Sequence, residues 1–124
     1  KKIEAGGAGV SSVSLDEKKV ALATPADGKL HVKFLSGGAD KTFTFDGYDL
    51  VGDTLFSPES DKIAVQVYNS KAEIDNPSAI FMVNFGTGSK TKIVEKDVPV
   101  YLKQWLSNSE IEYSSKYQDL ASDF

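Results

Sequence analysis

The stretch "LFSPESDKIAVQVY", residues 55–68, indicates the fold more directly than any other part of the chain. It reads as a short apolar strand, a polar turn, and a second strand rich in apolar and β-branched residues. Two related stretches occur elsewhere, "VSLDEKKVAL" at 13–22 and "WLSNSEIEY" at 105–113. The chain therefore repeats a hairpin unit three times.

The spacing of the repeat predicts the size of each unit. Val20, Ile63 and Ile111 hold equivalent places in the three hairpins and lie 43 and 48 residues apart. Periods of about 40 to 50 residues with four strands each are typical of propeller blades. We therefore expect successive four-stranded antiparallel units that cover one another's apolar faces.

The rest of the chain supports an all-β prediction. Further short runs rich in β-branched and aromatic residues are separated by Gly, Asp, Asn, Ser and Pro, which favour chain reversal. No stretch has convincing helical periodicity. The expected strands cover 19–24, 29–35, 41–45, 62–68, 79–85 and 91–95.

We expect one all-β domain over 1–124, with repeat units at approximately 10–46 and 53–96 and a partial unit at 101–124. The segment "KKIE" at 1–4 is similar to "TKIVE" at 91–95 and would be the last strand of a preceding blade. The chain thus begins and ends in mid-blade, which favours an excised piece of a longer protein.

The middle unit resembles a known repeat family. "FSPESDKIAV" at 56–65, the strand "AIFMVNF" at 79–85, then "GTG" and "TKIV", are similar to TolB-like or WD-like β-propeller repeats of extracytoplasmic bacterial proteins. Related propellers occur in prolyl-oligopeptidase-type peptidases. The resemblance covers 13–115, although only the middle unit has the Ser-Pro turn, at Ser57 and Pro58.

Two and a half blades cannot form a closed ring, because natural propellers have about four to eight. The chain is therefore a propeller fragment, one of several copies that complete a ring, or a two-sheet β-sandwich, since short strands at regular spacing suit sandwiches too. Uncovered strand edges favour pairing. We expect association with the rest of a parent protein, with a protein partner, or with further copies as a homo-oligomer.

Composition excludes several classes of function. The net charge is −4, from 14 basic and 18 acidic residues, so the chain has no excess of cations to neutralise nucleic acid. It has no cysteine and hence no disulfide or thiolate metal site. Its longest apolar runs, such as "AIFMV" at 79–83, are far shorter than the roughly 20 residues of a membrane-spanning helix.

No catalytic residue, metal site or cofactor is predicted. His31 is the only histidine and stands in a strand, without the "GxSxG" elbow that would supply a nucleophile. "GTGSK" at 86–90 lacks Walker spacing and precedes a strand, so it predicts a hairpin turn. Asp46, Asp49 and Asp53 lack the residue order of an EF-hand and fit a solvated loop better.

These observations predict a non-catalytic β-propeller-type binding module of an extracytoplasmic protein. The alternatives are a fragment of a peptidase propeller whose catalytic domain lies elsewhere, and a structural sandwich in a surface protein. Binding is expected on the loops that join one unit to the next and on the long loop 69–78. The candidate binding residues on these loops are Tyr48, Asp49, Asn69, Lys71, Glu73, Asp75 and Tyr101.

Overall fold

The computed structural model describes residues 10–24, 28–35, 40–70, 77–96, 100–115 and 118–123. Every regular element in these ranges is a β-strand. The strand proposed at 1–4 lies outside them. Within the described residues, no helix is long and apolar enough to cross a bilayer.

The strands form three antiparallel sheets in which hydrogen-bonded neighbours follow the order of the chain. The first sheet contains β1 (Val10–Val13), β2 (Lys19–Thr24), β3 (Lys29–Phe34) and β4 (Lys41–Phe43). The second contains β5 (Leu50–Phe56), β6 (Lys62–Tyr68), β7 (Ser78–Asn84) and β8 (Lys90–Lys96). The third contains β9 (Val100–Ser107), β10 (Glu110–Ser115) and β11 (Gln118–Asp123).

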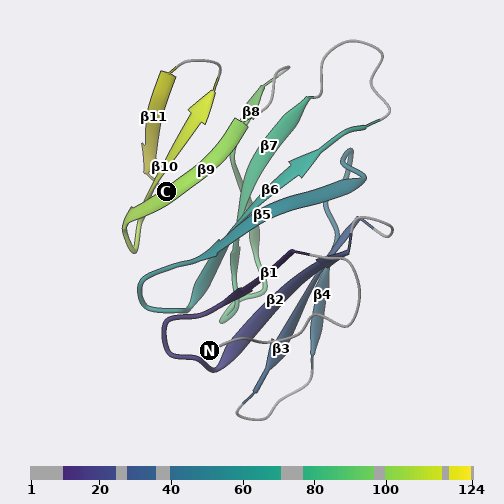
Figure 1. The fold of residues 1–124 in the computed structure, drawn as a ribbon, viewed down its shortest axis with the longest axis vertical. Coiled ribbons are helices and arrows are strands. Elements are labelled where there is room, and N and C mark those ends of the chain that lie inside the picture. The colour runs from purple at the N-terminus through teal and green to yellow at the C-terminus, as the bar shows by residue number, and fades with distance from the viewer. Residues whose placement is uncertain are drawn as a thin grey trace.

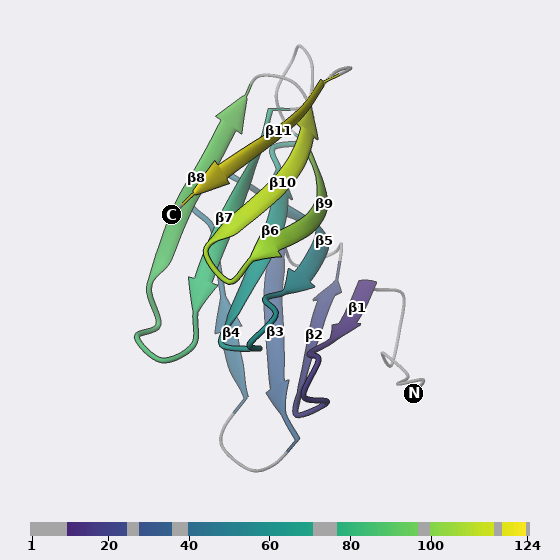
Figure 2. The same ribbon diagram turned by 90° about the vertical axis from the view of Figure 1, so that its left-hand side faces the viewer.

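The sheets follow one another as blades of a propeller do. Their first strands touch, β1 against β5 and β5 against β9, and Figures 1 and 2 show the three sheets stacked in chain order around these strands. The propeller-like, all-β antiparallel prediction is confirmed. The two-sheet sandwich is wrong, because three separate sheets pack in succession.

The three repeats are equivalent in the structure. Val20, Ile63 and Ile111 are all buried on the second strand of their sheets. Each lies opposite a residue of the first strand of its sheet: Val20 opposite Val13, Ile63 opposite Phe56, and Ile111 opposite Trp105. The hydrophobic period read from the sequence therefore marks the same place in each blade.

The middle sheet is apolar on both faces because it lies between the other two. Ile63, Val65 and Val67 of β6 belong to the core shared with the first sheet. Ala64 and Gln66, between them, are also buried, and Ala64 belongs to the core shared with the third sheet. The unbroken apolar character of β6 thus results from burial on both faces.

Aromatic side chains fill the interface between the first and second sheets. Phe34 meets Phe85 edge to face with ring centroids 5.9 Å apart, and Phe45 lies 5.0 Å from Phe81. Such pairs stabilise by about 0.5 to 1.5 kcal/mol beyond the burial of their area. These aromatic contacts therefore join the first sheet to the second.

Two hairpin turns have matching hydrogen bonds. Ser14 Oγ accepts from Lys19 N, and Ser57 Oγ accepts from Lys62 N, both at 3.1 Å. The fourth residue of each turn has a positive φ, 58° at Glu17 and 63° at Ser60. Lys19 and Lys62 thus begin the second strand in the same way in both sheets.

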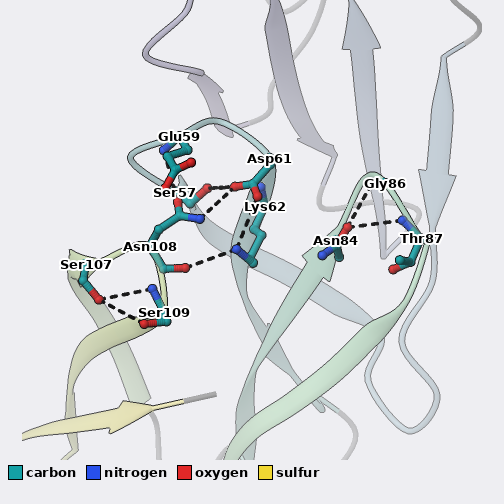
Figure 3. A network of polar contacts seen from close by, with 10 residues as sticks. All are labelled: Ser57, Glu59, Asp61, Lys62, Asn84, Gly86, Thr87, Ser107, Asn108 and Ser109. Carbon is teal, nitrogen blue, oxygen red and sulfur yellow. Dashed lines mark hydrogen bonds and ion pairs between the residues drawn. The ribbon is translucent and has the colours of Figure 1, made fainter.

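The turns also bond across sheets, as Figure 3 shows for the second and third. Glu59 N donates to Asn108 Oδ1 at 3.1 Å, and Asn108 Nδ2 donates to Asp61 Oδ1 at 3.2 Å. Lys62 Nζ donates to the Asn108 carbonyl oxygen at 3.2 Å. Asn108 therefore links the third sheet to the turn of the second.

Candidate functional site

A β-bulge distorts β5, the first strand of the middle sheet; we call the first strands β1, β5 and β9, which contact one another in succession, the inner strands. The pairing of β5 with β6 shifts register between Val51 and Thr54, which leaves Gly52 and Asp53 at the irregularity. Bulges re-aim side chains and are common beside active sites. The Asp53 side chain is exposed here, on a strand that touches the inner strands of both neighbouring sheets.

Gly52 permits the close approach of an aromatic side chain. A Cβ at this position would lie 2.8 Å from Tyr68 Cε2 and 3.5 Å from the Tyr68 hydroxyl. A contact of 2.8 Å is shorter than carbon atoms tolerate, so glycine is required for the observed position of the ring. Tyr68, at the end of β6, therefore lies directly against the bulge.

Gln66 orients the Tyr68 hydroxyl. Its Nε2 group donates to the Val100 carbonyl oxygen of β9 and to the Tyr68 hydroxyl. The nitrogen must face Val100 because a carbonyl oxygen only accepts. Since the Tyr68 oxygen accepts from Gln66, the hydroxyl hydrogen is directed away from the Gln66 nitrogen.

The Gln66 amide joins the second sheet to the third, but one of its atoms is buried without a hydrogen bond among the described residues. Gln66 is fully buried, and its Oε1 atom has no hydrogen-bond partner in the described structure. A buried acceptor left unpaired costs about 1 to 3 kcal/mol. Val100 makes a second hydrogen bond to the middle sheet, since its backbone N donates to Ser78 Oγ at 2.7 Å.

Asp53 and Tyr101 act electrostatically on Tyr68. Burial raises the pKa of Tyr68, the nearby Asp53 and Tyr101 raise it further, and the hydrogen bond from Gln66 lowers it in part. Tyr68 therefore remains a neutral hydrogen-bond donor at ordinary pH. We call Gly52, Asp53, Gln66, Tyr68 and Tyr101 the axial cluster, because the first strands of the sheets meet beside it.

The predicted loop residues are distributed over two places. Tyr101 belongs to the axial cluster and is 48% exposed. Tyr48 is instead half-buried, donates its hydroxyl hydrogen to Glu95, and packs its ring 6.0 Å from that of Phe81. Burial, followed by the bond to Glu95 and its charge, raises the pKa of Tyr48. Tyr48 therefore connects the loop that precedes β5 to β8 by a hydrogen bond.

Asp49 and Asn69 shape the long loop at its base. Asp49 Oδ1 accepts from Ser70 N at 2.8 Å, and the other carboxylate oxygen accepts from the Ser70 hydroxyl. Asn69 N donates to the Pro77 carbonyl oxygen at 2.9 Å. Lys71, Glu73 and Asp75 lie outside the described residues. Whether any of these loop residues contacts a ligand stays a prediction.

The other candidate motifs have structural surroundings. The turn within 86–90 is organised by Asn84 Oδ1, which accepts from Gly86 N and Thr87 N, as a hairpin turn requires. His31 Nδ1 lies 3.2 Å from Thr42 Oγ1 on the neighbouring strand. In the part of the chain that the structure describes, no three His, Asp or Glu side chains gather as a metal ion would need.

Comparison with known proteins identifies the fold. No protein-family model matches the sequence, and no curated protein matches it as a relative. Among solved structures, the chain is similar to a candidate 6-phosphogluconolactonase from Bacteroides fragilis, with a TM-score of 0.55 and 16% identity over 91% of this chain and 33% of that one. A candidate 6-phosphogluconolactonase from Bacteroides uniformis gives 0.53 and 19% over 98% of this chain and 43% of that one.

The chain thus spans less than half the length of either neighbour. At these identities the likeness establishes a shared propeller-like fold. Both neighbours carry the names of enzymes, which overturns the prediction of a non-catalytic binding module, its peptidase-propeller alternative and the expectation that the chain is no enzyme. That prediction relied on the lack of a local catalytic motif, but a propeller assembles its sites from several blades around a central channel.

Sequence reasoning missed most of the axial cluster. Gly52 followed by Asp53 inside an otherwise apolar strand is a signal for a bulge, but the sequence analysis placed Asp53 in a solvated loop. Tyr68 and Gln66 carry no such signal, because their roles depend on contacts with β5 and β9.

Proposed function

We propose that the chain forms two blades and part of a third in a propeller enzyme that hydrolyses a sugar lactone, and that the axial cluster supplies part of its active site. The exposed carboxylate of Asp53 on an inner-strand bulge is the observation that carries this proposal. The names of the two fold neighbours support the substrate class. The TolB-like turn sequence further supports a parent protein that acts outside the cytoplasm.

The arrangement suits general-base hydrolysis of a cyclic ester. The Asp53 carboxylate accepts a proton from water while the water oxygen attacks the carbonyl carbon. The bond from that carbon to the ring oxygen then breaks, and the ring oxygen takes the proton from Asp53 to become the hydroxyl of the open acid, which restores the Asp53 carboxylate. Water adds across one bond, and no other reactant is consumed.

Tyr68 is placed to stabilise the charge that develops on the carbonyl oxygen. Its hydroxyl already accepts from Gln66, so its hydrogen is available to that oxygen. Its raised pKa keeps the hydrogen in place. Pre-oriented donors of this kind contribute about 100- to 1000-fold to acyl-transfer rates.

The cluster fits the sugar ring better than it fits a phosphate group. None of its five members is basic, whereas phosphate recognition ordinarily uses Arg, Lys or a row of backbone N–H groups. Tyr101 and Asp53 can bond to sugar hydroxyls from the exposed side. A phosphate on the substrate would be held by another part of the protein.

The test is lactone hydrolysis by wild type and the Asp53→Asn variant. Proton release from glucono-δ-lactone and its 6-phosphate is followed above the spontaneous rate. We expect Asp53→Asn to lower kcat by about 100- to 10,000-fold and Tyr68→Phe by about 100-fold. Asp46→Asn, in the exposed turn before β5, is the matched control and should retain the rate.

Binding to this chain is measured separately by NMR titration with gluconate, the open product. The expected shifts are confined to the axial cluster and its neighbours. An Asp53→Asn variant as active as wild type, or shifts that avoid the cluster, would contradict the proposal.

A further inference from the structure

The side chain of Gln66 makes two hydrogen bonds from a single nitrogen. Its Nε2 atom donates to the Tyr68 hydroxyl oxygen at 2.5 Å and also to the Val100 carbonyl oxygen. Tyr68 stands two residues further along β6, whereas Val100 is the first residue of β9. One amide group therefore contacts the axial cluster and the third sheet together.

The two acceptors differ in what they tolerate from an amide. The Val100 carbonyl oxygen has no hydrogen to donate, whereas a tyrosine hydroxyl bonds equally well as an acceptor from Nε2 or as a donor to Oε1. Tyr68 by itself would accommodate either orientation of the Gln66 amide. The Val100 carbonyl oxygen therefore decides that the nitrogen, and not the oxygen, faces the hydroxyl.

This orientation is maintained although it leaves a polar atom unpaired. Gln66 is fully buried, and its Oε1 atom has no hydrogen-bond partner among the residues that the structure describes. Half a turn of the amide would let Tyr68 donate to Oε1, but it would also bring Oε1 against the Val100 oxygen, where two acceptors repel. The bond to Val100 thus outweighs the cost of the unpaired oxygen.

The Val100 backbone is held in place on both sides. Val100 is fully buried, and its backbone N donates to Ser78 Oγ of β7 at 2.7 Å. Side chains of the middle sheet therefore bond both its N–H and its C=O group. In its own sheet Val100 lies opposite Ser115 of β10. The carbonyl oxygen that orients Gln66 is consequently a fixed reference point.

We propose that Gln66 is a positioning residue for the Tyr68 hydroxyl, and that the Val100 carbonyl oxygen sets the polarity of the hydrogen bond between them. The hydroxyl oxygen is made the acceptor, so its hydrogen is directed away from Gln66 and is available to a ligand of the axial cluster. The third sheet thereby controls a donor that belongs to the second. The effect on catalysis rests on the proposed lactone hydrolysis, whereas the orientation of the hydroxyl does not.

Gln66→Glu reverses the polarity of this bond with little change in size. A protonated carboxyl group has one hydrogen, which the Val100 oxygen takes, and an ionised carboxyl group has none. In both forms Tyr68 becomes the donor, and its hydrogen turns toward the new carboxyl group. We expect kcat for lactone hydrolysis to fall by about 100-fold, as for Tyr68→Phe, with KM little changed. The double variant should lose no more than either single variant, because both remove the same donor.

Two further variants separate polarity from packing. Gln66→Met removes the bond to Tyr68 without supplying an acceptor, so kcat should fall less than in Gln66→Glu. Ser78→Ala is the matched control, because it removes the other side-chain hydrogen bond to Val100 and leaves Gln66 and Tyr68 in place. It should retain the wild-type kcat.

NMR of the full 124-residue chain measures the orientation of the hydroxyl apart from activity. The Cζ carbon of Tyr68 moves toward its phenolate shift when the hydroxyl donates a strong hydrogen bond, so Gln66→Glu should move it downfield and Gln66→Met should not. In wild type, the two Gln66 side-chain amide hydrogens should exchange slowly with water, because both are bonded and the residue is buried. The exchange measurement needs no variant to fold.

The outcomes distinguish this inference from the proposed function. Rapid exchange of the Gln66 amide hydrogens, or a Tyr68 Cζ signal that stays in place in Gln66→Glu, would overturn the polarity whatever the activity. A wild-type kcat in Gln66→Glu beside an inactive Tyr68→Phe variant, or an equal loss in Ser78→Ala, would overturn the positioning role and leave the proposed reaction standing. The expected Cζ change in a protein without lactone hydrolysis would support the polarity and overturn the proposed reaction.

Discussion

Replacing Ile111 by alanine tests whether the third sheet is packed on the second as a blade. Ile111 is fully buried in the core that this sheet shares with Ala64 and Ile80 of the middle sheet. The change removes three carbon atoms at about 0.8 kcal/mol each, or about 2.4 kcal/mol. The cavity left behind raises the expected loss to about 3 to 4 kcal/mol, a large part of the stability of an ordinary domain.

The assay is urea unfolding followed by circular dichroism and by Trp105 fluorescence, which reports on the third sheet directly. A loss of this size should lower the urea midpoint by about 2 M. Glu112→Ala is the matched control, because Glu112 is the next residue on β10 and is only half-buried; it should cost less than about 1 kcal/mol. Equal losses for the two variants, or a loss below about 1 kcal/mol for Ile111→Ala, would refute the packing of alternate residues against the middle sheet.

Two further changes test the bulge and the turn network. Gly52→Ala places a Cβ 2.8 Å from Tyr68 Cε2 and should destabilise the protein by about 1 to 3 kcal/mol in thermal unfolding. The control Gly86→Ala should be nearly neutral, because the nearest atom to its Cβ is a side-chain oxygen at 3.3 Å. Similar melting temperatures for the two variants would refute the close approach of Tyr68 to Gly52. Burial tends to raise the pKa of Asp61, but hydrogen bonds from Asn108 and Ser57 and the bond and charge of Lys62 outweigh it and hold the pKa below 3.8. A carboxyl whose pKa is lower in the folded state contributes stability at pH values above its unfolded pKa. That contribution is lost as the pH falls through the folded pKa. The urea midpoint of wild type should therefore exceed that of Asp61→Asn near neutral pH, and the difference should shrink below about pH 4; a difference that stays constant down to about pH 2 would contradict this.

The strands and the repeat were predictable from the sequence because their signals are local. Alternation in β3 places Leu30 and Val32 inside and Lys33 outside, as period-two patterning predicts. The equivalence of Val20, Ile63 and Ile111 followed from the spacing of similar hairpins. Which residues form the candidate site was much less accessible: of the seven residues proposed on the loops, only Tyr101 belongs to the axial cluster.

The sequence by itself determined the strand pattern, the turns and the repeated unit, since each depends on backbone preferences and apolar periodicity within a few neighbouring residues. Tertiary structure alone decided that the bulge at Gly52 meets Tyr68 and that Gln66 reaches Val100, 34 residues further along the chain. These contacts depend on strand register and on how one sheet packs against the next. Short-range patterns do not encode either, because many registers and packings satisfy the same alternation of apolar and polar residues.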